Sequence, residues 1–233
     1  MILDLHIHSS NSVDSLATPE SIVITARKRE IDCIAITDHG TIKGGLEGKR
    51  FSSDGNPIVI VGAEMATDRG DIIGLFLNEE IRSGDWGEVI DRIHAQGGIA
   101  ILPHPFKSHK LGDDHLSKVD LVEAFNSRVG PEKNNQALEL AKKKGKPTVA
   151  GSDAHFCSEI GRGRTIMEGG QDLRKALLRG GRVEGEYSSQ CMETISQFVK
   201  SARTRSYSDI PKCIVASVVT PAIARRRKKP LTF

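Results

Sequence analysis

Residues 31–40 read IDCIAITDHG, and the order of residue types within this stretch indicates the fold. A nearly continuous apolar run at residues 31–36 is followed almost at once by the polar pair Asp38 and His39. A short apolar run rich in β-branched residues is typical of a strand that is buried on both faces of a parallel sheet. The polar pair is then expected to lie just past the carboxyl end of that strand.

The same order of residue types recurs along the chain. Similar apolar runs lie at residues 1–5, 58–62, 98–102, 120–125 and 146–150. Segments with N-cap residues, early prolines or closing glycines predict helices at residues 18–29, 85–96, 131–144 and 172–179. Six or seven alternating strand and helix units predict an α/β fold, and they fit a closed barrel better than an open sheet. Residues 67–76 depart from this alternation and are predicted to form an extra strand, paired with the third strand as a hairpin.

Polar residues also follow the other apolar runs. They are His6 and His8, Glu64, His104, Glu123 and Asn126, and Asp153 and His155. Because the strands of a parallel barrel run in one direction, we expect these side chains to gather at one mouth, where barrel enzymes keep their active sites. Residues two apart in a strand point to the same side, so His6 and His8 are expected to reach one ion together. Imidazoles and carboxylates without thiolates predict a hydrolase site for two or three divalent ions.

The composition is that of a globular protein with one sizeable domain. The chain has 233 residues, of which 38% are hydrophobic and 27% charged, and its mean hydropathy is −0.29. Much of the net charge of +3 comes from the basic run at residues 225–229, so the composition does not demand a stable nucleic-acid partner. We expect a barrel domain over residues 1–190, followed by an extension over residues 191–233 that packs on the barrel and ends in the basic tail.

The cysteines and the N-terminus favour a cytoplasmic protein. The four cysteines lie far apart and form no CxxC pair, which argues against a disulfide framework and against a zinc ribbon. Asp4 and His6 stand where a signal peptide would be basic and then apolar. No apolar stretch reaches the roughly 20 residues that a membrane span needs, so no membrane partner is expected.

Five short motifs, in order, resemble those of one known superfamily. DLHIHSSNSVDS, AITDHG, GAEM, PHP and GSDAH are similar to the successive motifs of the PHP superfamily, named for polymerase and histidinol phosphatase. The resemblance covers roughly residues 1–165, about two thirds of the chain. It implies a distorted (βα)7 barrel with a metal site at the carboxyl ends of the strands. It also implies phosphoesterase activity with two or three Mn, Zn, Fe or Mg ions.

The resemblance also implies a set of ligands for each ion. The first ion would be held by His6, His8, Glu64 and Asp153, the second by Glu64 and His104, and the third by Asp14, His39 and His155. Asp38 would be a catalytic residue that orients His39 or a water, and His155 would also help the leaving oxygen. The chain departs from many members because no histidine follows its fifth strand. Glu123, Asn126 or a water would have to replace that ligand.

The expected reaction is hydrolysis of a phosphate ester by a water activated between the ions. A nucleotide, a nucleoside bisphosphate or an RNA end is the expected substrate, with Lys107, Asn126, Arg128 and Arg162 as candidate substrate-binding residues. Two alternatives stay open. An amidohydrolase usually bridges its ions with a lysine, where this chain has Glu64, and a non-catalytic module would use the basic tail to bind RNA or a protein partner. His109 lies in a polar loop and is expected to be exposed.

Overall fold

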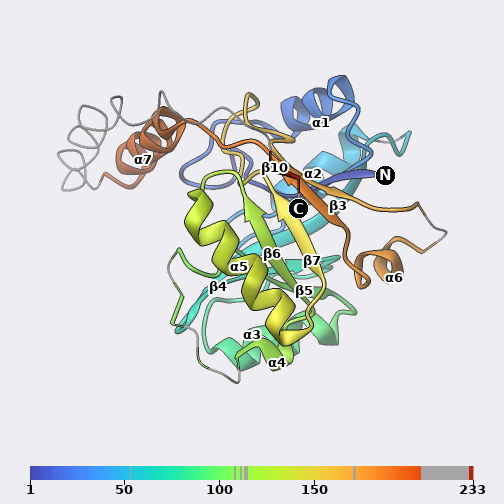
Figure 1. Cartoon of the computed structure of the whole chain (residues 1–233). Coiled ribbons are helices and arrows are strands. Elements are labelled where there is room, and N and C mark those ends of the chain that lie inside the picture. The colour runs from blue at the N-terminus through green and yellow to red at the C-terminus, as the bar shows by residue number, and fades with distance from the viewer. Residues whose placement is uncertain are drawn as a thin grey trace.

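The computed structural model describes residues 1–52, 54–107, 109–110, 112, 115–169, 172–205 and 231–232. These residues form one α/β unit around a curved sheet, with helices packed on its outer side (Figure 1). The basic run at 225–229 and most of the expected extension lie outside the described residues, and the boundary near residue 190 stays a prediction.

Seven strands form most of a nearly closed barrel. They are β1 (Ile2–Ile7), β2 (Cys33–Ile36), β3 (Ile58–Thr67), β4 (Gly70–Leu75), β5 (Ile99–Leu102), β6 (Leu121–Asn126) and β7 (Thr148–Gly151). All neighbours in this series pair in parallel except β4, which is antiparallel to both β3 and β5. A parallel bridge between Ile7 and Ala154 joins the first strand to the chain just past the seventh. The predicted α/β barrel and its β3–β4 hairpin are therefore confirmed.

Three further strands extend the sheet on the far side of β1. They are β8 (Gly163–Ile166), β9 (Arg182–Gly185) and β10 (Leu231–Thr232), and they follow one another antiparallel outward from β1. The sequence did not predict them because each is short and lacks a continuous apolar run.

The helices are α1 (Pro19–Lys28), α2 (Lys43–Phe51), α3 (Trp86–Ala95), α4 (His115–Lys118), α5 (Pro131–Lys144), α6 (Leu173–Leu177) and α7 (Gln190–Thr204). Thr18 caps α1 and Asp85 caps α3, each accepting a backbone N–H three residues on, as predicted. The α6 helix is shorter than the predicted 172–179. Helix α2 was not predicted because its three glycines lower helix propensity. At Gly45 a Cβ would lie 2.9 Å from Cα of Val61, so the glycine allows the helix to approach β3 closely.

A bulge in β1 aims its histidines into the barrel. The register against β2 shifts between Asp4 and Ile7. Below the shift, Leu3 and Leu5 belong to the apolar cluster inside the barrel; above it, Ile7 packs outside with residues of α1. One extra residue changes the alternation of side chains, so that His6 and the following His8 both turn inward above the apolar cluster.

Helix α7, the last helix among the described residues, is hydrogen-bonded to two loops at the mouth of the barrel. Nη1 of Arg128 donates to Oγ of Ser196 at 2.9 Å. Nη1 of Arg203 donates to the carbonyls of Ser12 at 2.8 Å and Ser15 at 3.0 Å. Across the described residues, no helix has both the length and the apolar character needed to cross a membrane.

Candidate metal centre

Four ligand atoms from three parts of the barrel converge on one point. His6 and His8 come from the end of β1, Glu64 from β3, and Asp153 from the loop after β7. The Nε2 atoms of His6 and His8 are 3.1 Å apart. Glu64 Oε2 lies 3.6 Å from His6 Nε2 and 3.3 Å from His8 Nε2, and Asp153 Oδ1 lies 3.6 and 3.4 Å from the same two atoms. All four side chains are buried.

These separations fit a divalent ion. A tetrahedral site with metal–ligand bonds of about 2.1 Å has ligand atoms about 3.4 Å apart, and the distances above scatter around that value. Two imidazoles and two carboxylates suit zinc, manganese or iron. The residues that the resemblance assigns to the first ion are thus brought together, and the ligand atoms of His6, His8 and Glu64 all lie within 4.8 Å of one another.

Hydrogen bonds outside this cage orient the histidine rings. His6 Nδ1 donates to Oε1 of Glu123 at 3.0 Å, which leaves Nε2 to face the cage. A bond of this kind fixes the ring orientation of a metal ligand and increases its basicity. Glu123 therefore supports His6 and is not placed as a ligand of the second ion. At Gly151 a Cβ would lie 2.3 Å from His6 Cβ and 2.5 Å from Glu123 Oε1, so only glycine leaves room for this pair.

A second candidate site uses the other oxygen of Glu64. Its Oε1 lies 3.0 Å from His104 Nε2, and Asp71 completes a group whose ligand atoms all lie within 4.8 Å of one another. Asp71 was missed because the sequence argument considered only the carboxyl ends of strands. Strand β4 is antiparallel, so its amino end lies at the mouth of the barrel. A polar residue at the start of the predicted hairpin strand was therefore the signal that could have identified Asp71.

The third candidate site lies nearer to solvent. Oδ2 of Asp14 is 3.3 Å from His39 Nε2, and its Oδ1 is 3.5 Å from His155 Nε2. The Nδ1 atom of His155 donates to the carbonyl of Asp153 at 2.8 Å, so Nε2 is the nitrogen left for a ligand. The side chain of His39 is 41% exposed, whereas Asp14 and His155 are buried. His39 therefore opens the third candidate site to solvent.

The charges of the cluster match its geometry. Burial, together with the neighbouring His39 and His155, lowers the pKa of His8 to about 3, so this ring is neutral at pH 7. Burial opposes ionisation of Glu64, but His6 and hydrogen bonds from nearby histidines hold its pKa well below the usual value. The same balance between burial and His6 keeps the pKa of Asp153 low. The carboxylates are therefore ionised and ready to bind a cation.

Two of the candidate ligands have an unusual backbone. His104 has a φ of 29° and Asp153 a φ of 53°, although neither is glycine. Such conformations cost on the order of 1–3 kcal/mol and persist where the surrounding structure imposes them, often at functional sites. Both residues place their side chains in the cluster, which accounts for the strain.

Asp38, predicted as catalytic, anchors a loop. Its carboxylate accepts from the backbone N–H of Ser9 at 2.6 Å and from the hydroxyls of Ser9 at 2.7 Å and Ser12 at 2.8 Å. These bonds hold the segment that leads to Asp14. His39 is next to Asp38 in sequence, and its backbone N–H donates to the same Ser12 hydroxyl.

The four candidate substrate-binding residues lie in different surroundings. Lys107 Nζ lies 3.6 Å from Asp153 Oδ2 and is 34% exposed, so it is available at the mouth. Arg128 is not available there, because its side chain is only 3% exposed. Its guanidinium forms a bidentate ion pair with Glu159, with Nε 3.0 Å from Oε1 and Nη2 2.7 Å from Oε2. Asn126 is also fully buried, and its amide donates to Glu123 and Asp153.

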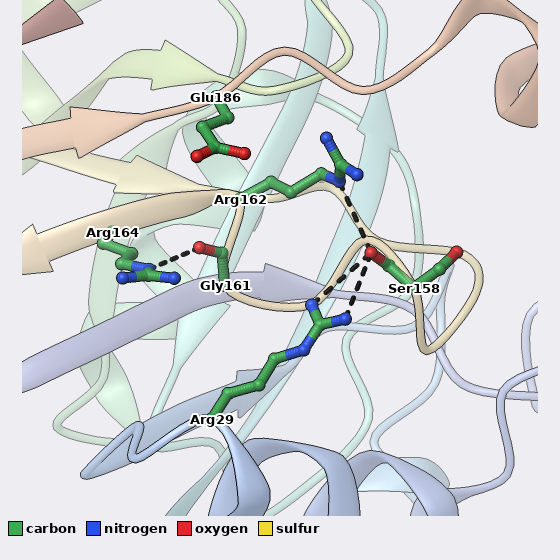
Figure 2. Close-up of a pocket in the computed structure, with 6 residues that line it drawn as sticks. All are labelled: Arg29, Ser158, Gly161, Arg162, Arg164 and Glu186. Carbon is green, nitrogen blue, oxygen red and sulfur yellow. Dashed lines mark hydrogen bonds between the residues drawn. The ribbon is translucent and has the colours of Figure 1, made fainter. Parts of the chain in front are cut away.

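The fourth, Arg162, donates to the carbonyls of Ser158 and Tyr187 and lines a separate pocket (Figure 2). The geometry therefore argues against direct substrate contact by Arg128 and Asn126. Arg128 was predicted from the chemistry of its guanidinium and Asn126 from its place at the end of a strand. Neither criterion shows whether the polar groups are already used. His109 also differs from expectation, because it is half-buried and bonds the carbonyl of Asp71 at 2.8 Å.

Fold and site together define a barrel protein that can hold a cluster of divalent ions at one mouth. Residues 4–145 match the family model of the PHP domain, and residues 131–181 match that of a PHP-associated segment. The chain belongs to the PHP family.

Two relatives are proteins of Methanocaldococcus jannaschii described as uncharacterized. One is 42% identical over 54% of this chain and 82% of its own length. The other is 37% identical over 69% of this chain and 68% of its own length.

Solved structures share the fold at low identity. A two-domain protein of Bacteroides vulgatus, containing a predicted PHP-like metal-dependent phosphoesterase, matches with a TM-score of 0.67 and 18% identity over 80% of this chain. This chain spans 65% of that protein. An amidohydrolase of Chromobacterium violaceum with bound sulfate matches with a TM-score of 0.57 and 15% identity, over 68% of this chain and 89% of that one. At such identities the likeness concerns the fold.

Proposed function

We propose that the chain is a metal-dependent phosphoesterase that hydrolyses a phosphate ester of a small molecule or a nucleic-acid end. The observation that carries the proposal is the position of Glu64. One of its oxygens faces His6 and His8, and the other faces His104. A carboxylate placed in this way can bridge two ions.

Ions held by these residues would lower the pKa of water and neutralise charge on a phosphoryl group. The protein itself supplies orientation. Glu123 fixes His6, and the backbone carbonyl of Asp153 fixes His155. His39, being partly exposed, lies where a substrate would enter.

Lys107 is proposed to contact the phosphate. Burial disfavours its charged form, but the nearby Asp153, Glu193 and Glu64 carboxylates raise the pKa of Lys107 above its ordinary value. The ammonium group therefore keeps its charge beside the cluster. A phosphate at the mouth would meet this cation on one side and the metal ligands on the other.

The amidohydrolase alternative rests on the fold of the Chromobacterium protein. Glu64 occupies the bridging position, where an amidohydrolase usually carries a lysine, so the ligand set favours phosphate chemistry. No observation on the described residues favours the non-catalytic module.

The proposal is tested by metal analysis and turnover on the same preparations. Purified chain is expected to contain divalent metal and, with added Mn²⁺, to hydrolyse an aryl phosphate, a nucleotide or a short RNA. His8→Ala is expected to lose both metal and turnover, whereas His94→Ala, which alters a partly exposed histidine paired with Asp120, keeps both. Metal binding without hydrolysis of any mono- or diester would contradict the proposal, and hydrolysis of amides instead would favour the alternative.

A further inference from the structure

A second polar pocket lies between the end of α1 and the strands β8 and β9 (Figure 2). It has a volume of about 320 Å³ and is lined by Arg29, Ser158, Gly161, Arg162, Arg164 and Glu186. None of these residues belongs to the candidate metal sites. The size falls within the range of about 300–1,000 Å³ that is typical of small-molecule sites.

Backbone carbonyls hold the three guanidinium groups in place. Arg164 Nε donates to the carbonyl of Gly161 at 2.6 Å. Arg162 Nη1 donates to the carbonyl of Tyr187 at 3.0 Å, and Arg29 Nη1 donates to the carbonyl of Ile160. All three side chains are half-buried. Groups fixed in this way lose little conformational freedom when a ligand arrives.

Among the residues that the structure describes, the positive charge of the pocket is not balanced. Three cations face one carboxylate, Glu186, and among the described residues none of the three arginines forms an ion pair with a carboxylate. Glu184 lies opposite Arg164 in the β8–β9 register, but it pairs with Arg182. Half-buried like charges repel one another, and an anion would relieve that repulsion.

The free donors suit phosphate. The terminal Nη1 and Nη2 atoms of Arg164 make no hydrogen bond within the part of the chain that the structure describes. A guanidinium fork binds phosphate oxygens in pairs and so selects this geometry over a spherical anion. We infer that the pocket binds the phosphate group of a small phosphorylated molecule, at a site separate from the metal centre.

The pocket shares a loop with the metal centre. Residues 152–162 carry Asp153 and His155 at one end and the pocket at the other. Between them, Oε2 of Glu159 accepts the backbone N–H of His155 at 3.1 Å. A phosphate bound to Arg162 would therefore contact the same loop that positions the candidate ligands Asp153 and His155.

The test measures phosphate binding to chelator-treated protein, so that it does not depend on hydrolysis. Titration calorimetry with inorganic phosphate is expected to give one site per chain. Arg164→Gln is expected to weaken binding at least tenfold, and Glu186→Gln to strengthen it at least threefold. Arg92→Gln removes an exposed arginine of α3 and is expected to leave the affinity unchanged.

Three results would overturn the inference. The wild type could fail to bind phosphate, Arg92→Gln could weaken binding as much as Arg164→Gln does, or Glu186→Gln could leave the affinity unchanged. Glu186→Gln removes no cation, so it tests the inference even if Arg164→Gln does not fold. A single-stranded oligonucleotide serves as a second probe. If it binds more tightly than phosphate, and Arg164→Gln abolishes that binding, the ligand is a nucleic-acid backbone and the small-molecule assignment is wrong.

Discussion

The Nε2 atoms of His6 and His8 lie 3.1 Å apart, and the outer nitrogen of each ring is already engaged. His6 Nδ1 bonds Glu123, and His8 Nδ1 bonds the hydroxyl of Ser12, whose own proton goes to Asp38. Both rings therefore direct an Nε2 lone pair toward one point when they are neutral. A cation at that point would displace the proton that His6 Nε2 otherwise donates to His8 Nε2, and both nitrogens would then be free to bind the ion.

This relationship predicts that metal binding releases protons. Burial disfavours protonated His6, but the carboxylates of Asp153, Glu123 and Glu64 raise its pKa well above the usual value when no ion is bound. The metal-free protein then carries a proton on His6 at pH 7, and an ion must displace it. Metal affinity is expected to rise with pH, with about one proton released for the first ion. Calorimetry in buffers of different ionisation enthalpy measures this number, and a value near zero would contradict the assignment.

Glu123→Gln is expected to weaken metal binding without abolishing it. The amide cannot match the charge of the carboxylate that holds His6, and loss of such a partner typically costs about 10–100-fold in metal affinity. Competition with a chromophoric chelator gives the affinity. The matched control is Glu168→Gln, an exposed glutamate outside the site. An unchanged affinity for Glu123→Gln would show that this bond does not tune the ligand.

Gly151→Ala is expected to damage both stability and metal binding. The added methyl group would collide with His6 Cβ and Glu123 Oε1. Overpacking a buried site costs about 1–3 kcal/mol. Chemical denaturation and metal content are the two readouts. Gly84→Ala, where a Cβ meets nothing within 4 Å, is the control, and equal stability of the two variants would rule out the proposed crowding.

Arg128→Ala is expected to destabilise the fold by about 3–5 kcal/mol, because it leaves the buried carboxylate of Glu159 without its partner. Replacing both residues, as Arg128→Met with Glu159→Leu, is expected to cost less. Lys142→Ala breaks an exposed ion pair with Glu139 and is expected to cost about 0.5 kcal/mol or less. Urea titration distinguishes these cases, and a loss for Arg128→Ala no larger than that for Lys142→Ala would mean that the pair is not important for stability.

The sequence predicts the barrel and most of the candidate metal ligands because both follow from one local pattern, a buried run that ends in polar residues. It does not predict Asp71, because that residue reaches the mouth from the start of a reversed strand. Nor does it predict that His6 and His8 depend on a bulge, since only the register of β1 against β2 reveals the extra residue.

The chemical type of a residue also does not reveal whether its polar groups are free. Arg128 and Arg162 look alike as candidates for binding phosphate. Arg128 is neutralised by Glu159, whereas Arg162 lies in the arginine-lined pocket. The difference depends on contacts with residues distant in the chain, 31 positions away in the case of Glu159.

Arg203 connects α7 to the segment around Asp14. Its guanidinium donates hydrogen bonds to the carbonyls of Ser12 and Ser15, which lie on either side of Asp14 in the sequence. The segment around the candidate ligand Asp14 is therefore held by a helix that follows it in the chain by almost 200 residues. During translation these two bonds can form only after residue 203 has left the ribosome, later than the last candidate ligand, His155.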